Sequence, residues 1–461
     1  MRTIASLAAD LVAGRTTSRA LAEQAIAQIS TQSSPAFLKV FADSALAEAD
    51  ASDRLRALGI VRSPVEGLPV SVKDLFDVAG DVTRAGSSAL AKYNPSPAPV
   101  DAPAVARLRA AGAVIIAKTN MVEFAFGGVG TNPSDGTPTN PADSTRVPGG
   151  SSGGAAVGVA RDTVSMGLGT DTRGSVRIPA ALCGVTGFKP TQARVPLAGA
   201  FPLSYTLDSV GPLCHTVADC AVFDAILSGE GPAAEAAAPI APPVRSLRLL
   251  HPIGSYLLDG LDETVDTAFK RSMARLLKAG AMVFSGDSVD PFANAQALFD
   301  RGGFASPEAY QIHKPILASH SDAYDPNVAS RIALGEQWGS AADYVQLTLD
   351  RKRVIREANE LLQRYDALVC PTTPIVAPTI EEVSSSPDAY VAANMNLLRN
   401  PGLANMIDGC AVTIPCHEKG ELPVGLMLIG ANGSDRKLLG VARAVESVLG
   451  RGDAWQSGVE Y

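Results

Sequence analysis

Apolar positions in the first half of the chain alternate between helical spacing and short continuous runs. Helical spacing on both sides of Gly14-Arg15 predicts two amphipathic helices, with Thr17 or Ser18 as the N-cap of the second. Between residues 67 and 189, helical patterns at 103–112 and after 154 alternate with predicted buried strands, which occupy 68–72, 113–118 and 163–171. This alternation predicts an α/β fold built on a layered sheet.

The alternation resumes after residues 228–246, a segment rich in Ala and Pro that has the composition of a linker. The elements expected beyond it are a strand at 247–253, a helix capped by Asp262, a long charged helix after Ser340, a strand at 367–373, a hairpin formed by 411–416 and 422–430, and a helix from about 435. Composition does not change across the segment. We therefore expect one domain over 1–461, with a core at about 67–191 and a lobe at about 247–461.

Composition and charge exclude several classes of protein. The 461 residues are 46% hydrophobic and carry a net charge of −8, which gives no electrostatic reason to bind nucleic acid or an anionic membrane. The N-terminus lacks the continuous apolar core of a signal peptide, and no stretch reaches the length of a membrane span. The six cysteines and five histidines show no metal-ligand spacing, which favours reduced thiols and no metal or other cofactor. We expect a cytoplasmic protein.

The stretch PGGSSGG at 148–154 allows three interpretations. It is a flexible linker, or a G-x-S-x-G elbow that makes Ser151 the nucleophile of a histidine triad, or part of another arrangement of serines. The apolar residues at 155–157 disfavour a linker, and Pro148 disfavours the strand that an elbow requires. None of the five histidines stands in a distinctive local setting.

A second serine and a lysine supply the third interpretation. Ser175 lies in the turn TDTRGS, whose successive amides can converge on one point and stabilise an oxyanion. Lys73 follows directly on the predicted buried strand at 68–72. A lysine there either pairs with Asp74 or another acid, or is desolvated and neutral, since burial lowers a lysine pKa by several units. The local sequence leaves both states open.

Three segments together resemble the amidase signature family of serine hydrolases, namely VKDLFD at 72–77, GTPTNPADSTRVPGGSSGGAA at 136–156 and GLGTDTRGSVRIPAALCGVTGFKPT at 167–191. The likeness spans essentially the whole chain. It implies a central twisted mixed β-sheet covered by helices on both faces, and a Ser–cisSer–Lys triad. In that triad Ser175 is the nucleophile, Ser151 is the bridge that follows a cis peptide after Gly150, and Lys73 is the base.

The resemblance also implies an oxyanion hole made of four successive backbone amides, those of Thr172, Arg173, Gly174 and Ser175. The chain departs from the family at Arg173, where a small residue is usual. We expect a negative φ there and a side chain that points away, as a surface or salt-bridging arginine. Around the site, Ser152 is expected to support its loop, and Asp171 and Arg177 to pair and brace the turn.

The implied activity is acyl transfer to Ser175, followed by hydrolysis of a small-molecule amide, anilide or carbamate, the last as in urethanase-type members. The alternative within the family is the glutaminase subunit of a tRNA-dependent amidotransferase. We expect an apolar acyl or aryl substrate, with a small polar amide as the alternative, because possible walls are offered by Phe126, Gly127, Phe201 and Tyr205. The resemblance is also compatible with a homodimer.

Overall fold

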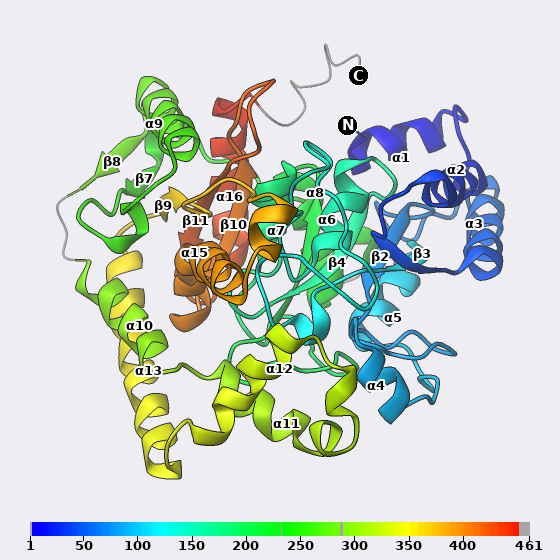
Figure 1. The fold of residues 1–461 in the computed structure, drawn as a ribbon. Helices are drawn as coiled ribbons and strands as arrows, with labels where there is room; N and C mark the ends of the chain where they lie inside the picture. The colour runs from blue at the N-terminus through cyan, green and yellow to red at the C-terminus, as the bar shows by residue number, and fades with distance from the viewer. Residues whose placement is uncertain (1, 232, 286–288, 451–461) are drawn as a thin grey trace.

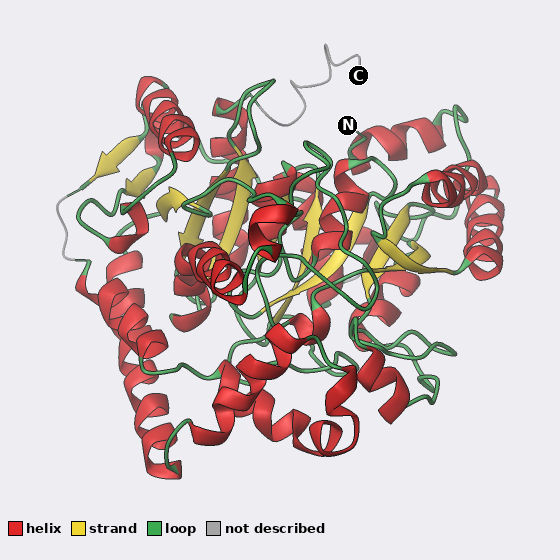
Figure 2. Ribbon diagram, in the orientation of Figure 1, coloured by secondary structure: helices red, strands yellow, loops and turns green. Residues whose placement is uncertain are grey.

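A computed structural model describes residues 2–231, 233–285 and 289–450. Its strands form one central sheet that runs across the molecule, with helices packed around it (Figures 1 and 2). The strands are β1 Phe37–Val40, β2 Pro69–Lys73, β3 Val114–Thr119, β4 Met166–Asp171, β5 Thr186–Lys189, β6 Ser209–Cys214, β7 Arg248–Leu250, β8 Met282–Phe284, β9 Ala367–Pro371, β10 Cys410–Pro415 and β11 Gly425–Gly430.

Helices make up most of the remaining regular structure. They are α1 Ile4–Val12, α2 Ser18–Thr31, α3 Ala42–Ala57, α4 Ser88–Tyr93, α5 Pro103–Ala110, α6 Gly153–Ala160, α7 Arg177–Cys183, α8 Val217–Ser228, α9 Glu263–Lys278, α10 Asp290–Asp300, α11 Ala305–His320, α12 Pro326–Ala333, α13 Ala341–Leu362, α14 Ile380–Ser384, α15 Pro387–Met406 and α16 Asp435–Val448. In the part of the chain that the structure describes, none of these helices is long and apolar enough to cross a bilayer.

The sheet has eleven strands in the order β1-β3-β2-β4-β6-β5-β10-β11-β9-β7-β8. Strand β2 is parallel to both β3 and β4, and β7 is parallel to β8 and β9. The other neighbours are antiparallel, so the sheet is mixed. In Figure 1 the N-terminal helices α1 to α3 lie at one end of the sheet, and α9 lies at the other.

Helices cover both faces of the sheet, as successive residues of one strand show. Leu213 of β6 packs in the cluster formed by α6 and α7, whereas Cys214 packs with residues of α8 and α16. Adjacent side chains of a strand point to opposite faces, so the two helix pairs lie on opposite sides. The predicted α/β fold, a mixed sheet covered by helices on both faces, is therefore confirmed.

Local capping signals located several helices correctly. Thr17 caps α2, Asp262 caps α9, and Ser340 caps α13 through a reciprocal capping box with Asp343. The strand expected at 247–253 is shorter than predicted, because a turn that contains Pro252 follows β7. Strands β1, β5, β6 and β8 and helices α3, α4, α7, α8, α10 to α12, α14 and α15 were not predicted.

The linker-like segment at 228–246 lies against the C-terminal helix α16. Ala236 is buried, and the carbonyl oxygens of Ala237 and Pro239 accept hydrogen bonds from Arg436 and Arg443. The described residues around 236–239 are therefore held by contacts with α16, although the composition of the segment is typical of a tether.

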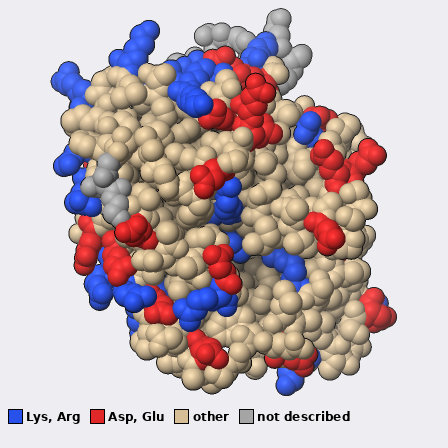
Figure 3. Space-filling model, turned by 60° about the vertical axis from the view of Figure 1, so that its left-hand side comes forward, with Lys and Arg blue, Asp and Glu red and all other residues tan. Residues whose placement is uncertain are grey.

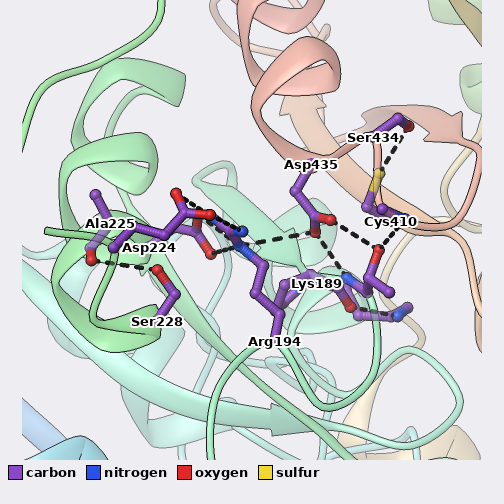
Figure 4. A network of polar contacts seen from close by, with 12 residues as sticks. Lys189, Arg194, Asp224, Ala225, Ser228, Cys410, Ser434 and Asp435 are labelled. Atoms are coloured by element: carbon purple, nitrogen blue, oxygen red, sulfur yellow. Dashed lines mark hydrogen bonds and ion pairs between the residues drawn. The ribbon is translucent and has the colours of Figure 1, made fainter.

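A polar network ties the end of the motif-rich region to the C-terminal helix (Figure 4). Arg194 donates to the carboxylate of Asp224 on α8 at 2.7 Å, and it lies 4.0 Å from Asp435 at the start of α16. Asp435 in turn accepts from the amide and the hydroxyl of Thr191, at 2.7 and 2.8 Å. These contacts hold the segment after β5 against two helices on one side of the sheet.

Candidate active site

The candidate site lies where two neighbouring parallel strands end. Strands β2 and β4 pair in parallel with Val72 opposite Leu168, so the last residue of β2 lies beside the end of β4. The carboxyl ends of adjacent parallel strands share one edge of a sheet, which is a common position for binding sites. Lys73 and the turn that follows Asp171 are therefore placed together by the register of the strands.

Lys73 is fully buried and is bonded to hydroxyl groups. Its Nζ donates to Oγ of Ser151 at 2.7 Å and to Oγ1 of Thr170 at 3.0 Å. Burial lowers the pKa of Lys73 to about 7, while the charges of Asp171 and Asp208 act against that shift. The ion pair with Asp74 that the sequence left open is not formed, since Asp74 faces Lys118 at 3.6 Å.

The PGGSSGG stretch is a buried loop that leads into α6. The peptide between Gly150 and Ser151 is cis, as expected. The amide of Gly150 donates to the carbonyl of Gly128, and the carbonyl of Ser151 accepts from the amide of Val122. Neither the linker nor the histidine elbow fits, because the stretch is buried and Oγ of Ser151 is bonded to a lysine.

Ser152 joins this loop to the turn that carries Ser175. Its amide donates to the carbonyl of Ser175 at 3.2 Å, and its hydroxyl donates to the carbonyl of Thr170 at 3.4 Å. The role expected for Ser152, support of the loop, is therefore matched by two contacts. Oγ of Ser175 makes no hydrogen bond to any residue in the described ranges.

The carboxylate of Asp171 organises the turn between β4 and α7. It accepts from the amides of Gly174 and Val176, from the guanidinium of Arg177 at 2.9 and 3.0 Å, and from Asn405 of α15. Burial alone would raise the pKa of this carboxyl, but the charge and hydrogen bonds of Arg177 hold it well below its usual range. Asp171 and Arg177 thus form the buried pair that was expected.

The contact from Gly174 changes the expected oxyanion hole. Its amide is 2.7 Å from Oδ1 of Asp171, so it is already engaged. Within the described ranges the amides of Thr172, Arg173 and Ser175 donate to no other residue, and these three remain the candidates. Gly174 has a φ of +122°, and a Cβ there would lie 2.7 Å from Cβ of Pro401, so the position requires glycine for its backbone shape.

A cavity of about 260 Å³ opens beside Ser175. Its wall includes Thr172, Arg173 and Ser175 from the turn, and Phe126 and Gly127 from the loop after β3. The opposite wall comes from the helices α10 to α12 and their connections, through residues such as Phe299, Phe304, Arg331 and Trp338. Two of the expected substrate-wall residues, Phe126 and Gly127, therefore line the same cavity as Ser175.

The other two expected wall residues, Phe201 and Tyr205, do not line this cavity. They line a neighbouring cavity of about 320 Å³, which shares Ala125, Thr172 and Leu203 with the first. Tyr205 is 65% exposed, whereas the ring of Phe201 packs beside Phe124. Aromatic residues in the chain gave no indication of which loop faces which side of Thr172, so the substrate-wall role of Phe201 and Tyr205 stays a prediction.

Arg173 was expected to be a surface or salt-bridging arginine, and it is neither. Its φ is not positive, as predicted, but its side chain lies in the cavity wall with the guanidinium 3.9 Å from the ring centre of Phe299. Its Nε is buried without a hydrogen-bond partner. Burial and then the charge of Arg331 lower the pKa of Arg173 to about 10.

Arg331 on α12 is a second arginine of the cavity that the sequence did not reveal. It lies over the ring of Phe126, 4.3 Å from its centre, and donates to the carbonyl of that residue. No sequence signal marked it, because α12 contains no motif and its position beside Phe126 depends on contacts between distant segments. The arginine at position 173, where the family usually has a small residue, did mark this part of the site. Its place in the cavity wall could not be inferred from the sequence, because it depends on the same contacts between distant segments.

Known proteins resemble this chain over nearly its full length. The family model described as Amidase matches residues 20–439. A 2-amino-5-chloromuconic acid deaminase from Comamonas testosteroni is 36% identical, with 88% of this chain and 87% of that protein covered. A glutamyl-tRNA(Gln) amidotransferase subunit from Chloroflexus aurantiacus is 35% identical, with 96% of each covered. A crystal structure of an amidase superposes with a TM-score of 0.84 at 34% identity, covering 96% of this chain and 99% of the other.

The depressed pKa of Lys73 predicts an acid limb in the pH profile. If neutral Lys73 is the base, kcat/KM should fall about tenfold per unit of pH below a midpoint near 7, because protonated lysine accepts no proton. Asp208→Asn should move this limb to lower pH, since the charge of Asp208 raises the Lys73 pKa. A profile that stays flat between pH 5.5 and 8 would contradict the assignment.

The pair of Asp171 and Arg177 predicts a large loss of stability when it is broken. Arg177→Met leaves a buried carboxylate without its cation, and we expect a loss of about 3–5 kcal/mol in the free energy of unfolding. The matched control is Lys270→Met, whose partner is Asp266 on an exposed helix face, with an expected loss below about 1 kcal/mol. Urea unfolding followed by circular dichroism measures both, and similar small losses would refute the bracing role.

Proposed function

The chain belongs to the amidase family, and from this premise we propose that it hydrolyses an amide, anilide or carbamate through an acyl-enzyme on Ser175. As a family member it is an enzyme that cleaves carbon–nitrogen bonds. The observation that carries the proposal is the contact of 2.7 Å between a buried lysine of lowered pKa and the hydroxyl of Ser151, beside a cavity lined by Ser175.

The first half of the proposed reaction forms the acyl-enzyme. Neutral Lys73 takes the hydroxyl proton of Ser151, Ser151 takes that of Ser175, and Oγ of Ser175 attacks the carbonyl carbon. The oxyanion that develops is stabilised by free amides of the turn, for which Thr172, Arg173 and Ser175 are the candidates. The proton then returns through Ser151 to the leaving nitrogen, and the C–N bond breaks.

The second half regenerates the enzyme. Water attacks the ester carbonyl and gives one proton to Ser151, whose own hydroxyl proton passes to Lys73. The ester bond to Oγ of Ser175 then breaks, and this oxygen takes a proton from Ser151, which recovers one from Lys73. Every proton that leaves Ser175 in the first half is thus restored in the second. The reaction needs no group beyond these side chains, backbone amides and water.

A second candidate function is the glutaminase subunit of a tRNA-dependent amidotransferase. It is favoured by the 35% identity to the subunit from Chloroflexus aurantiacus over 96% of both chains. The same three side chains would then release ammonia from glutamine. The two functions differ in whether the chain turns over simple amides without other subunits.

We expect each of three substitutions, Ser175→Ala, Ser151→Ala and Lys73→Ala, to lower kcat by at least about 10³-fold, because each removes one member of a relay that acts as a unit. Initial rates on anilides, aryl carbamates and primary amides, with circular dichroism to check folding, provide the measurement. Ser134→Ala and Lys92→Ala are the matched controls, since both residues are exposed. Normal turnover by Ser175→Ala would disprove the acyl-enzyme.

The alternative is tested with the purified chain and glutamine. A stand-alone amidohydrolase should release ammonia from simple amides and leave glutamine largely untouched. A glutaminase subunit should do the reverse, with a rate that rises when the other subunits of an amidotransferase are added. Ammonia release measured by a coupled assay separates the two outcomes.

A further inference from the structure

The cavity beside Ser175 has two positive charges in its wall and no negative charge. Arg173 and Arg331 both line it, and the wall contains no aspartate or glutamate among the described residues that form it. Two neighbouring cations without a carboxylate are costly to bury, so their presence calls for an explanation.

Neither arginine forms an ion pair with a carboxylate in the described ranges. Arg331 donates to the carbonyl of Phe126 and interacts with the hydroxyl of Tyr390, and both of these partners are uncharged. Carboxylates act on the two guanidinium groups only from a distance, Asp325 on Arg331 and Asp300 on Arg173. The charge in the cavity wall is therefore not neutralised by direct contact.

The surroundings of Arg173 fix its position without satisfying its charge. Its guanidinium stacks on Phe299, and a Cβ added at Gly402 would lie 3.0 Å from its Cγ and 3.1 Å from its Nε. The side chain thus packs against both the ring of Phe299 and the backbone of α15 at Gly402. A planar guanidinium held in this way is ready to bind a carboxylate through two parallel hydrogen bonds.

The remaining wall of the cavity is apolar. It consists mainly of side chains without charge, among them Leu203, Leu207, Phe304, Leu334, Trp338 and Leu398. A ligand that fits must therefore place one anionic group at the arginines and an uncharged chain along the rest. Figure 3 shows basic groups at a central hollow of the face drawn, with acidic groups beside them as well.

We propose that the substrate carries a carboxylate bound by Arg173 and Arg331, and carries no ammonium group, so that the enzyme acts on monoamides of dicarboxylic acids. The carboxylate supplies the negative charge that the cavity lacks, while an ammonium group would meet two cations and no acid. This proposal rests on the proposed function for the place of the amide, which lies at Ser175. It differs from the apolar acyl or aryl substrate expected from the sequence.

The inference separates the two candidate functions by charge alone. Glutamine is glutaramate with an added α-ammonium group beside its carboxylate. A cavity lined by arginines and apolar groups should accept glutaramate and penalise glutamine. The proposed substrate class therefore favours the stand-alone hydrolase over the glutaminase subunit.

The test compares amides that differ only in charge. Succinamate, glutaramate and adipamate are assayed beside the neutral amides in which a methyl group replaces the carboxylate, and glutamine is assayed beside glutaramate. We expect the best carboxylated amide to exceed its neutral partner in kcat/KM by about 10- to 100-fold, which is the range for losing hydrogen bonds to a charged group. Neutral amides that equal or exceed their carboxylated partners would overturn the proposal.

Variants of the two arginines test the assignment directly. Arg173→Gln and Arg331→Gln should each lower the ratio of kcat/KM for the carboxylated amide to kcat/KM for its neutral partner by about 10- to 100-fold. Arg301→Gln is the matched control, because Arg301 lies next to Gly302 of the cavity wall but is exposed and paired with Asp350. Equal losses on charged and neutral amides would assign the arginines a purely structural role.

A binding measurement keeps the inference independent of turnover. Glutarate and adipate should raise the melting temperature of the wild type and of Ser175→Ala, but not that of Arg173→Gln. Arg173→Met should melt no lower than the wild type, because it removes an uncompensated charge. If no amide is hydrolysed but dicarboxylates bind through the arginines, the acyl-enzyme proposal fails and the anion site stands. If neutral amides are hydrolysed and dicarboxylates do not bind, the acyl-enzyme proposal stands and the anion site is refuted.

Discussion

The carboxylate of Asp171 is the interaction on which the site depends. It lies at the end of β4 and accepts hydrogen bonds from three elements. The donors are backbone amides of its own turn, the guanidinium of Arg177 at the start of α7, and the side-chain amide of Asn405 on α15. A buried carboxylate with so many donors resists displacement, because losing any one partner leaves a charge in a medium of low polarity. The position of Ser175, four residues further on, follows from this anchoring.

Two buried ionisable groups of the site, Asp171 and Lys73, have opposite surroundings. Asp171 is charged and fully paired, whereas Lys73 is buried against hydroxyl groups and has no carboxylate in direct contact among the described residues. Desolvation therefore outweighs the opposing charges of Asp171 and Asp208 and brings the pKa of the lysine close to 7. The same sheet edge thus holds a paired anion, Asp171, and an amine of lowered pKa, the proposed base Lys73.

Much of this arrangement could be predicted from the sequence, and the reasons for the rest are specific. Lys73, Ser151 and Ser175 stand in dense motifs, and the strands that bring them together have clear apolar runs. The engagement of the Gly174 amide by Asp171 is a matter of hydrogen-bond geometry that spacing does not encode. The positions of Phe201, Tyr205 and Arg331 depend on contacts between segments far apart in the chain. The spacing of apolar residues in a helix such as α12 predicts the helix but does not indicate which part of the protein it packs against.

The cavity has two walls of different origin, and this division bears on how such an enzyme can change. The proposed reactive groups come from the segment between β2 and α7, while Phe299, Phe304, Arg331 and Trp338 come from one continuous stretch of helices, α10 to α12 and the turn after them. In Figure 1 α11 and α12 lie together below the sheet. Substitutions in that stretch can reshape what the enzyme accepts while the hydrogen bonds around Asp171 stay intact. Natural variation or directed evolution confined to about fifty consecutive residues is therefore a route to new substrates that leaves the proposed catalytic residues unchanged.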